Sequence, residues 1–350
     1  MTDTRGANGA QTSQTRIRRI ATEEAFAIPE QMDALRVLTE QDGGGADVPF
    51  WRMMTHDANP FAQRVYRQLL DLEGERLAIM DDQGVDMHVL AVTSPGVQMF
   101  PAAQAVPMAV LANDRLAAVI AAHPRRFAGL ATIAPQDPAA AAREIARAVG
   151  GLGLNGVMIN SHTFDEYLDE DKFLPIFEAA DAHGAPIYIH PRAPSAGMAQ
   201  PYLKYGLETA IWGYGMETGL HAVRLIMSGI FDRFPKLKVI LGHMGEGLPF
   251  WLWRLDYMFA NGSNRPSLAR LPSDYMRDNF MITTSGMNWP KVLNFCIDAV
   301  GIDNIMWAID YPYQETPGAI SFFDAMPLSD DDKAKIYHRN AERVFGIAPA

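Results

Sequence analysis

Cysteine is nearly absent from this sequence of 350 residues: only Cys296 is present, which excludes a disulfide within one chain and suits a reducing compartment. Cys296 lies in VLNFCIDAV, an amphipathic helical pattern, so we expect a buried, unreactive thiol. Long apolar runs are missing too, since none approaches the roughly 20 residues that a membrane-spanning helix needs. The first residues, MTDTRGANGAQTSQTR, lack the apolar centre of a signal peptide. We therefore expect residues 1–16 to form a disordered tail on a cytoplasmic protein that has no membrane as partner.

Basic residues are outnumbered by acidic ones: 30 Lys and Arg stand against 41 Asp and Glu, for a net charge of −11. This balance argues against nucleic acid as a partner. It does not exclude an anionic substrate, because a local site can be cationic inside an acidic protein. The apolar share of 48% and the charged share of 20% are typical of a folded protein. The length allows one large α/β domain or two ordinary ones.

Short apolar runs recur along the chain and are separated by helical patterns. Their apolar character is nearly continuous rather than alternating, as in parallel strands that are buried on both faces. Eight such runs occur, at residues 18–24, 85–92, 127–134, 155–161, 186–191, 238–244, 280–286 and 305–312.

Eight strands that alternate with helices predict an α/β fold, a closed (β/α)₈ TIM barrel, as a single domain over residues 17–350. The long segment 27–84 between the first two runs is an insertion, and we expect it to fold over the barrel mouth. The alternative is a doubly wound open sheet. It usually has fewer strands and a glycine-rich first turn, and no G-x-G-x-x-G motif follows the first run here.

Polar residues that can bind a metal end four of the predicted strands. Glu23 ends the first, His190 the fifth, His243 the sixth and Asp310 the eighth. Chemistry in such barrels takes place at the carboxyl ends of the strands, which all open at one mouth. A single histidine after a strand is more often structural, but a purely structural explanation would have to apply four times. We therefore predict a shared metal site with Glu23, His190 and Asp310 as ligands. Because neighbouring strand side chains point to opposite faces, Glu24 should face helices or solvent.

This layout of ligand, His, His and Asp on strands one, five, six and eight resembles the amidohydrolase superfamily. Its hydrolytic members commonly begin with His-x-His, where this sequence reads Glu23-Glu24-Ala25. That departure is similar to the decarboxylase branch, which includes γ-resorcylate, 2,3-dihydroxybenzoate, 5-carboxyvanillate and aminocarboxymuconate semialdehyde decarboxylases. The segments ATEEAFA, INSHT, YLDE, GHMGE and DYPY carry the likeness, and the first three look closest to 5-carboxyvanillate decarboxylases.

The resemblance implies an enzyme, a nonoxidative carboxy-lyase that removes CO₂ from a hydroxylated benzoate such as 5-carboxyvanillate. Two carboxylates and an imidazole suit one divalent ion, Mn²⁺ first and Zn²⁺ as the alternative. Asp310 is placed to act as the acid that protonates the ring. His243 would contact the substrate or Asp310, and Glu246 would orient His243. Glu246 also has a plain explanation, as a carboxylate favoured in the first turn of a helix.

Several other residues are expected to contact the substrate, a small aromatic carboxylic acid. By the resemblance, Arg254 reaches the site of a neighbouring subunit in a homodimer or homotetramer and pairs with a carboxylate. Its plain explanation is a surface residue of a helix. Thr93, Tyr214 and Tyr313 are expected to line the pocket. Two arginines of the insertion, Arg52 and Arg64, are further candidates for binding a carboxylate, and His162 could border the site.

Two other classes of function remain open at this point. A metal-dependent hydrolase or hydratase of an aromatic-breakdown intermediate would use the same ion to activate water, although the missing His-x-His weighs against it. A non-catalytic binder of small molecules would predict a broken ligand set, whereas the set here is intact. Among decarboxylases, γ-resorcylate and 2,3-dihydroxybenzoate are the alternative substrates.

Overall fold

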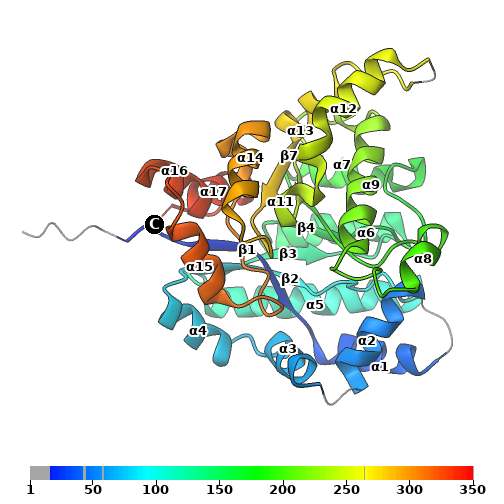
Figure 1. The fold of residues 1–350 in the computed structure, drawn as a ribbon. Helices are drawn as coiled ribbons and strands as arrows, with labels where there is room; N and C mark the ends of the chain where they lie inside the picture. Colours follow the sequence, from blue (N-terminus) through cyan, green and yellow to red (C-terminus); the bar gives the residue numbers. More distant parts are fainter. Residues whose placement is uncertain (1–15, 42–44, 57–58, 264, 350) are drawn as a thin grey trace, which may run out of the picture.

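The computed structural model describes residues 16–41, 45–56, 59–263 and 265–349, and Figure 1 shows its fold. The predicted tail therefore lies, except for Arg16, outside the described residues. Eight parallel strands pair in chain order. They are β1 (Ile20–Phe26), β2 (Met87–Val92), β3 (Phe127–Thr132), β4 (Gly156–Asn160), β5 (Ile187–His190), β6 (Val239–Leu241), β7 (Phe280–Thr283) and β8 (Ile305–Met306).

Backbone hydrogen bonds between β1 and the segment that begins with β8 close the sheet. The Thr22 amide donates to the Trp307 carbonyl at 3.1 Å, and the Ala25 amide donates to the Tyr311 carbonyl at 2.7 Å. An open sheet would leave these two edges apart. The structure thus confirms the predicted barrel and excludes the doubly wound alternative.

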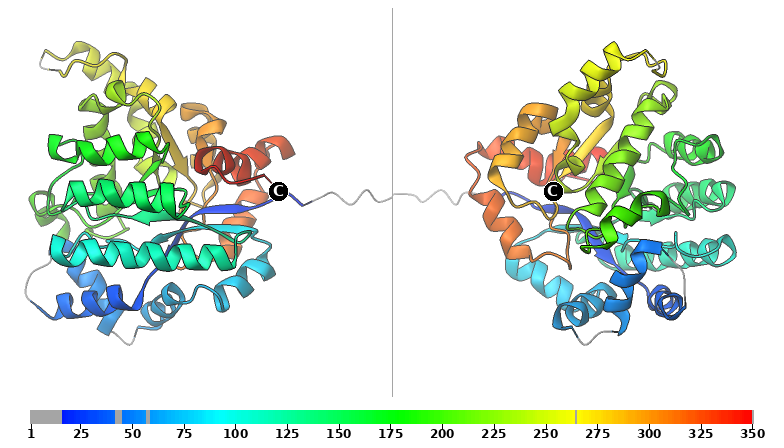
Figure 2. Two further views of the ribbon diagram at one scale, coloured as in Figure 1. Left: turned by 180° about the vertical axis from the view of Figure 1, so that it is seen from behind. Right: turned by 45° about the vertical axis from the view of Figure 1, so that its right-hand side comes forward.

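Helices connect the strands and surround the barrel (Figures 1 and 2). The longer ones are α1 (Pro29–Glu40), α2 (Val48–His56), α3 (Pro60–Leu70), α4 (Glu75–Gln83), α5 (Ala102–Ala122), α6 (Pro138–Ile145), α7 (Leu174–Ala182), α8 (Ala196–Leu203), α9 (Gly213–Met227), α12 (Leu248–Asn261), α13 (Pro272–Asn279), α14 (Pro290–Val300) and α15 (Thr316–Asp324). The shorter ones are α10 (Ile230–Arg233), α11 (His243–Glu246), α16 (Asp330–Ala334), α17 (Asn340–Phe345), η1 (Gly45–Asp47), η2 (Ala146–Gly151), η3 (Asp171–Phe173), η4 (Ile302–Asn304) and η5 (Lys335–Arg339).

The inside of the barrel is a packed core. Alternate residues of the strands, such as Val89, Leu130 and Ile240, form one buried apolar cluster, which Phe345 and Ile347 at the end of the chain join. A larger cluster lies between the strands and the outer helices, and it contains Cys296, which is buried as expected. Because the barrel is filled by side chains, only its open end is available for a site.

The insertion contains the helices α1 to α4, and Figure 1 shows α1, α2 and α3 at the end of the barrel toward which β1 runs. On α2, the Phe50 ring lies 6.3 Å from the ring of Tyr313, which follows β8. The insertion therefore covers the barrel mouth, as the sequence predicts.

The sequence was expected to contain no segment that is long and apolar enough to cross a membrane, and one described helix contradicts this expectation. By length and composition alone, α5 meets that description. In the structure α5 packs against β3 and α6 as part of the outer layer of the barrel.

Candidate active site

The three predicted metal ligands lie together at the barrel mouth. One ligand atom each from Glu23, His190 and Asp310 falls within 4.8 Å of the other two. His190 is the last residue of β5, as predicted, but Glu23 lies inside β1 and Asp310 follows the end of β8 at Met306. The pairing of β1 with β2 shifts between Ala21 and Glu24, which marks a bulge beside Glu23.

The Glu23 carboxylate is buried and held from one side. Its Oε2 accepts hydrogen bonds from the hydroxyls of Tyr188 and, at 2.8 Å, Thr283, whereas Oε1 is buried and has no hydrogen-bond partner among the described residues. Burial alone would raise the pKa of Glu23, but the neighbouring imidazoles of His243 and His190 hold it below its ordinary value. A buried carboxylate oxygen that lacks a hydrogen bond is costly unless something positive contacts it. Oε1 therefore fits an ion.

His190 presents its free nitrogen to the same point. Its Nδ1 donates to the Pro191 carbonyl at 2.8 Å, which leaves Nε2 as the nitrogen that can face an ion, and Nε2 lies 3.4 Å from Glu23 Oε1. Asp310 has a φ of +76°, a left-handed conformation that a side chain makes unfavourable and that is frequent at functional sites. Two carboxylates and one imidazole fit a divalent ion such as Mn²⁺ or Zn²⁺, and three protein ligands leave positions for a substrate.

His243 and Glu246 form the predicted pair beside the three ligands. His243 Nδ1 lies 2.7 Å from Glu246 Oε1, and His243 Nε2 lies 3.7 Å from Glu23 Oε1 and 3.9 Å from Asp310 Oδ2. Burial opposes a charge on His243, but the carboxylates of Glu246 and Glu23 raise its pKa well above the ordinary value. His243 does not end a strand, because β6 stops at Leu241. Both His243 and Glu246 belong to the turn α11, where their φ angles are +49° and +53°.

A cavity of about 590 Å³ leads outward from this cluster, a volume typical of small-ligand sites. His190, His243 and Asp310 line its inner end, and Phe50 and Met53 of α2 line its wall. The cavity thus combines an apolar wall, which suits an aromatic ring, with a polar inner end.

The predicted pocket residues divide into two groups. Tyr214 and Tyr313 line the cavity, and Thr93, which lines a small space beside Glu23, shares a 2.6 Å hydrogen bond with the Tyr313 hydroxyl. Arg254 is exposed on α12 and does not line the cavity of its own chain.

The two arginines of the insertion and His162 also lie outside the cavity. Arg52 donates to the Thr39 carbonyl at 2.8 Å, and Arg64 is directed at Gln68 and at the Pro312 carbonyl. His162 is buried in a separate polar cluster. No Lys or Arg of the described residues lines the cavity.

A family model described as Amidohydrolase matches residues 48–347. The chain belongs to the amidohydrolase family. Among solved structures, this amidohydrolase is similar to 5-carboxyvanillate decarboxylase LigW from Sphingomonas paucimobilis, with 50% identity, a TM-score of 0.92, and coverage of 95% of this chain and 100% of that one.

Two further relatives are informative. The 5-carboxyvanillate decarboxylase of Novosphingobium aromaticivorans, solved with manganese and 4-hydroxy-3-methoxy-5-nitrobenzoic acid, is 42% identical, with a TM-score of 0.90 and coverage of 94% of this chain and 96% of that one. The gamma-resorcylate decarboxylase of Rhizobium sp. is 35% identical over 341 residues, which are 94% of this chain and 98% of that protein.

Several residues that support the site of this amidohydrolase escape sequence reasoning. Tyr188 precedes His190 by two positions on β5, so both point to the same side, and this spacing was the available signal. The hydroxyl of Thr283 offered no comparable signal. Glu208 also lines the cavity and is buried, and its Oε2 has no hydrogen-bond partner in the part of the chain that the structure describes.

Glu24 was expected to face helices or solvent, and the structure excludes solvent. It is 1% exposed, and its two carboxylate oxygens accept the backbone amides of Ile309 and Tyr311, each at 2.9 Å. Burial raises the pKa of Glu24 to about 8. The second acid of the pair therefore holds the closure between β1 and the segment after β8, while the first faces the site.

Proposed function

We propose that this amidohydrolase is a metal-dependent, nonoxidative decarboxylase of a hydroxylated benzoate, with 5-carboxyvanillate as the leading substrate. The observation that carries the proposal is the free Glu23 Oε1 beside His190 Nε2 and Asp310, at the inner end of a cavity that is large enough for a substituted aromatic ring. The relatives described above, which act on 5-carboxyvanillate and γ-resorcylate by their names, support the reaction class.

Mn²⁺ is the proposed ion, held by Glu23, His190 and Asp310. The manganese in the Novosphingobium aromaticivorans relative supports this choice, while Zn²⁺ has no support among the relatives described above. When bound, a divalent ion supplies positive charge that favours the ionised form of a hydroxyl next to the departing carboxylate. The roles of Tyr188 and Thr283 are to hold Glu23 Oε2, so that Oε1 stays directed at the site.

Asp310 is the proposed proton donor. Its carboxyl group lines the inner end of the cavity, where it faces the space that the ring would occupy. The proton passes from Asp310 to the ring carbon that bears the leaving carboxylate, and a C–H bond forms there. The C–C bond to the carboxylate then breaks, its electron pair returns to the ring, and CO₂ departs. Asp310 is left as a carboxylate.

His243 supports this step from beside the ring. Glu246 accepts the Nδ1 proton of His243, which directs Nε2 toward Glu23 and Asp310. With its raised pKa, His243 carries positive charge next to two carboxylates. It therefore offers a hydrogen bond to the anionic substrate or to Asp310 as the proton leaves.

Arg254 is the proposed source of the positive charge that the cavity of one chain lacks. The helix α12 that carries Arg254 exposes the aromatic residues Phe250 and Trp253, which are 71% and 73% exposed, respectively. Such an exposed apolar face suits an interface between copies of the chain. We expect Arg254→Ala to raise KM by about tenfold or more, as loss of a charged contact to a carboxylate should. An unchanged KM would mean that Arg254 is a surface residue that does not contact the substrate.

A screen of hydroxylated benzoates tests the reaction itself. 5-Carboxyvanillate, 2,6-dihydroxybenzoate (γ-resorcylate) and 2,3-dihydroxybenzoate are each offered with Mn²⁺ and with Zn²⁺, and CO₂ release is followed beside consumption of the acid. We expect one CO₂ for each acid consumed, fastest with 5-carboxyvanillate and Mn²⁺. Consumption of an acid or of an unsaturated intermediate without CO₂ would favour the hydratase or hydrolase reading. If the protein binds these benzoates but converts none of them, the result would favour a non-catalytic binder of small molecules.

A further inference from the structure

An ion pair joins the insertion to the strand that carries His190. Asp47, the last residue of η1, accepts hydrogen bonds on Oδ2 from Arg192 Nη2 and, at 3.0 Å, from Arg192 Nε, and on Oδ1 from the Ala193 amide at 3.0 Å. Arg192 lies two residues after His190. Asp47 is 3% exposed and Arg192 is 4% exposed, so water competes little for these hydrogen bonds.

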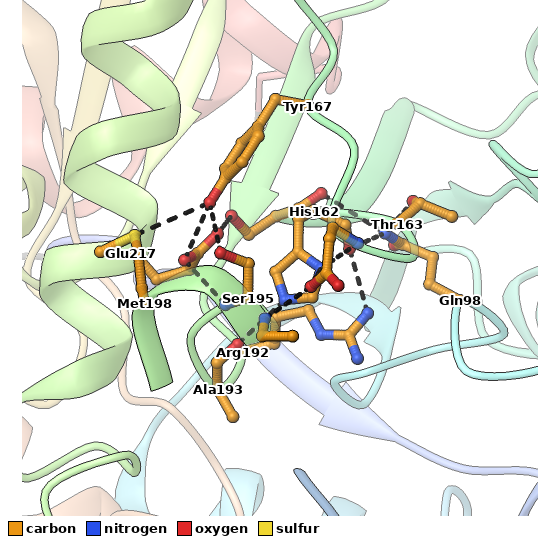
Figure 3. Close-up of polar contacts among 12 residues, drawn as sticks. Gln98, His162, Thr163, Tyr167, Arg192, Ala193, Ser195, Met198 and Glu217 are labelled. Atoms are coloured by element: carbon orange, nitrogen blue, oxygen red, sulfur yellow. Dashed lines mark hydrogen bonds and ion pairs between the residues drawn. The ribbon is translucent and has the colours of Figure 1, made fainter. Parts of the chain in front are cut away.

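The barrel side of this ion pair is held by further polar contacts, which Figure 3 shows. Arg192 Nη1 donates to the His162 carbonyl at 3.0 Å, and His162 Nε2 donates to the Ala193 carbonyl at 3.1 Å. Gln98 Nε2 in turn contacts Thr163 Oγ1 at 2.7 Å and the His162 carbonyl at 3.2 Å. The loops after β4 and β5 therefore present Arg192 in one fixed position.

The insertion side of the ion pair leads directly into the cavity wall. Asp47 is followed at once by α2, and Phe50 and Met53 of α2 line the cavity. Within the described residues, Asp47 is the side chain of η1 and α2 that makes charged contacts with the barrel. The helices α1 and α3 pack against α2, and the ion pair of Asp47 with Arg192 ties this group of helices to the barrel beside the site.

We propose that Asp47 is a positioning residue for substrate binding: through Arg192 it sets α2, and with it Phe50 and Met53, over the metal centre. Asp47 does not line the cavity, so it acts through the wall that it places rather than by contact with the reacting atoms. This role rests on the proposed function only for the choice of substrate. It predicts a defect in KM rather than in metal content or in the protonation step.

Three variants separate this role from that of an ordinary buried ion pair. Asp47→Asn keeps the shape and removes the charge. Asp47→Ala combined with Arg192→Met removes both charges, so no unpaired charge stays buried and the protein can fold even if the single variant is unstable. The matched control is Asp169→Asn. Asp169 accepts two hydrogen bonds from Arg224, at 2.7 and 2.9 Å, one on each carboxylate oxygen, and neither residue lines the cavity.

The measurements are kcat and KM for the best substrate of the screen, manganese content, melting temperature, and hydrogen–deuterium exchange of residues 45–56. We expect both Asp47 variants to raise KM by about tenfold or more, because small misplacement of a binding wall has effects of that size. Manganese content should stay at the wild-type level and kcat within about threefold of it. Exchange in 45–56 should accelerate relative to the strands, while Asp169→Asn should leave KM and this exchange unchanged.

Two results would overturn the proposal. In one, both Asp47 variants keep the wild-type KM and the wild-type exchange of 45–56. In the other, activity falls in step with manganese content, so that the ion pair serves the ligand His190 instead of α2. If the wild-type protein decarboxylates none of the benzoates, the proposed function fails. The exchange comparison then still decides whether Asp47 places α2.

Discussion

Gly242 offers a sharp test of the metal centre, because its missing side chain leaves room for a ligand. A Cβ at this position would lie 2.7 Å from Glu23 Oε1 and 2.8 Å from Oε2. The backbone of Gly242, with φ −70° and ψ −174°, is one that alanine adopts freely. The effect of Gly242→Ala therefore comes from the contact with Glu23 and not from backbone strain.

The Glu23 carboxylate must retreat by at least about 0.3 Å, since real Cβ contacts essentially never fall below 3.0 Å. Retreat strains the hydrogen bonds from Tyr188 and Thr283, and hydrogen bonds to a charged group contribute about 1.5–3 kcal/mol each. A combined loss of about 2–4 kcal/mol corresponds to a metal affinity lowered by about thirtyfold to a thousandfold.

Metal content after dialysis, the Kd for Mn²⁺ by titration calorimetry, and the melting temperature together test this prediction. Gly197→Ala is the control, because a Cβ on Gly197 in α8 meets nothing within 4 Å. It should bind metal normally and be as stable as the wild type or slightly more stable. A Gly242→Ala protein that folds, keeps one Mn²⁺ per chain and turns over normally would refute the assignment of Glu23 as a ligand.

Three further predictions concern single side chains. Asp310→Asn should lower kcat by about 10²-fold or more with little change in melting temperature, and normal turnover would remove Asp310 from the role of acid. His190→Ala should lose bound metal by elemental analysis, and stoichiometric metal would count against that ligand. Burial lowers the pKa of His221 from 6.5 to about 3, and its Nε2 accepts the Leu168 amide at 3.1 Å. Because only the neutral form accepts, the free energy of unfolding should fall by up to about 4–5 kcal/mol as pH drops from 6.5 toward 3. Urea denaturation at a series of pH values measures this free energy. It should fall less steeply with decreasing pH in His221→Gln than in the wild type.

The sequence alone determined the architecture and the three residues that the barrel brings together as candidate metal ligands. Near-continuous apolar runs separated by helical patterns indicate buried parallel strands, and parallel strands in a barrel bring their carboxyl ends to one mouth. Glu23, His190 and Asp310 were therefore identifiable although they are far apart in the chain. The pair of His243 and Glu246 was identifiable because the two residues are three positions apart, a local spacing that a turn brings together.

Only the tertiary structure decided how these groups are held. Where a strand stops depends on its hydrogen bonds to neighbours, so sequence patterns overestimated β8 and misplaced Glu23 within β1. Glu24 caps the amides of Ile309 and Tyr311 because the barrel closes there, and no local pattern states which strand edges meet. Asp47 meets Arg192 across 145 positions of sequence. Long-range pairs of this kind follow from the packing of whole elements, whereas periodicity reports only which face of one element is buried.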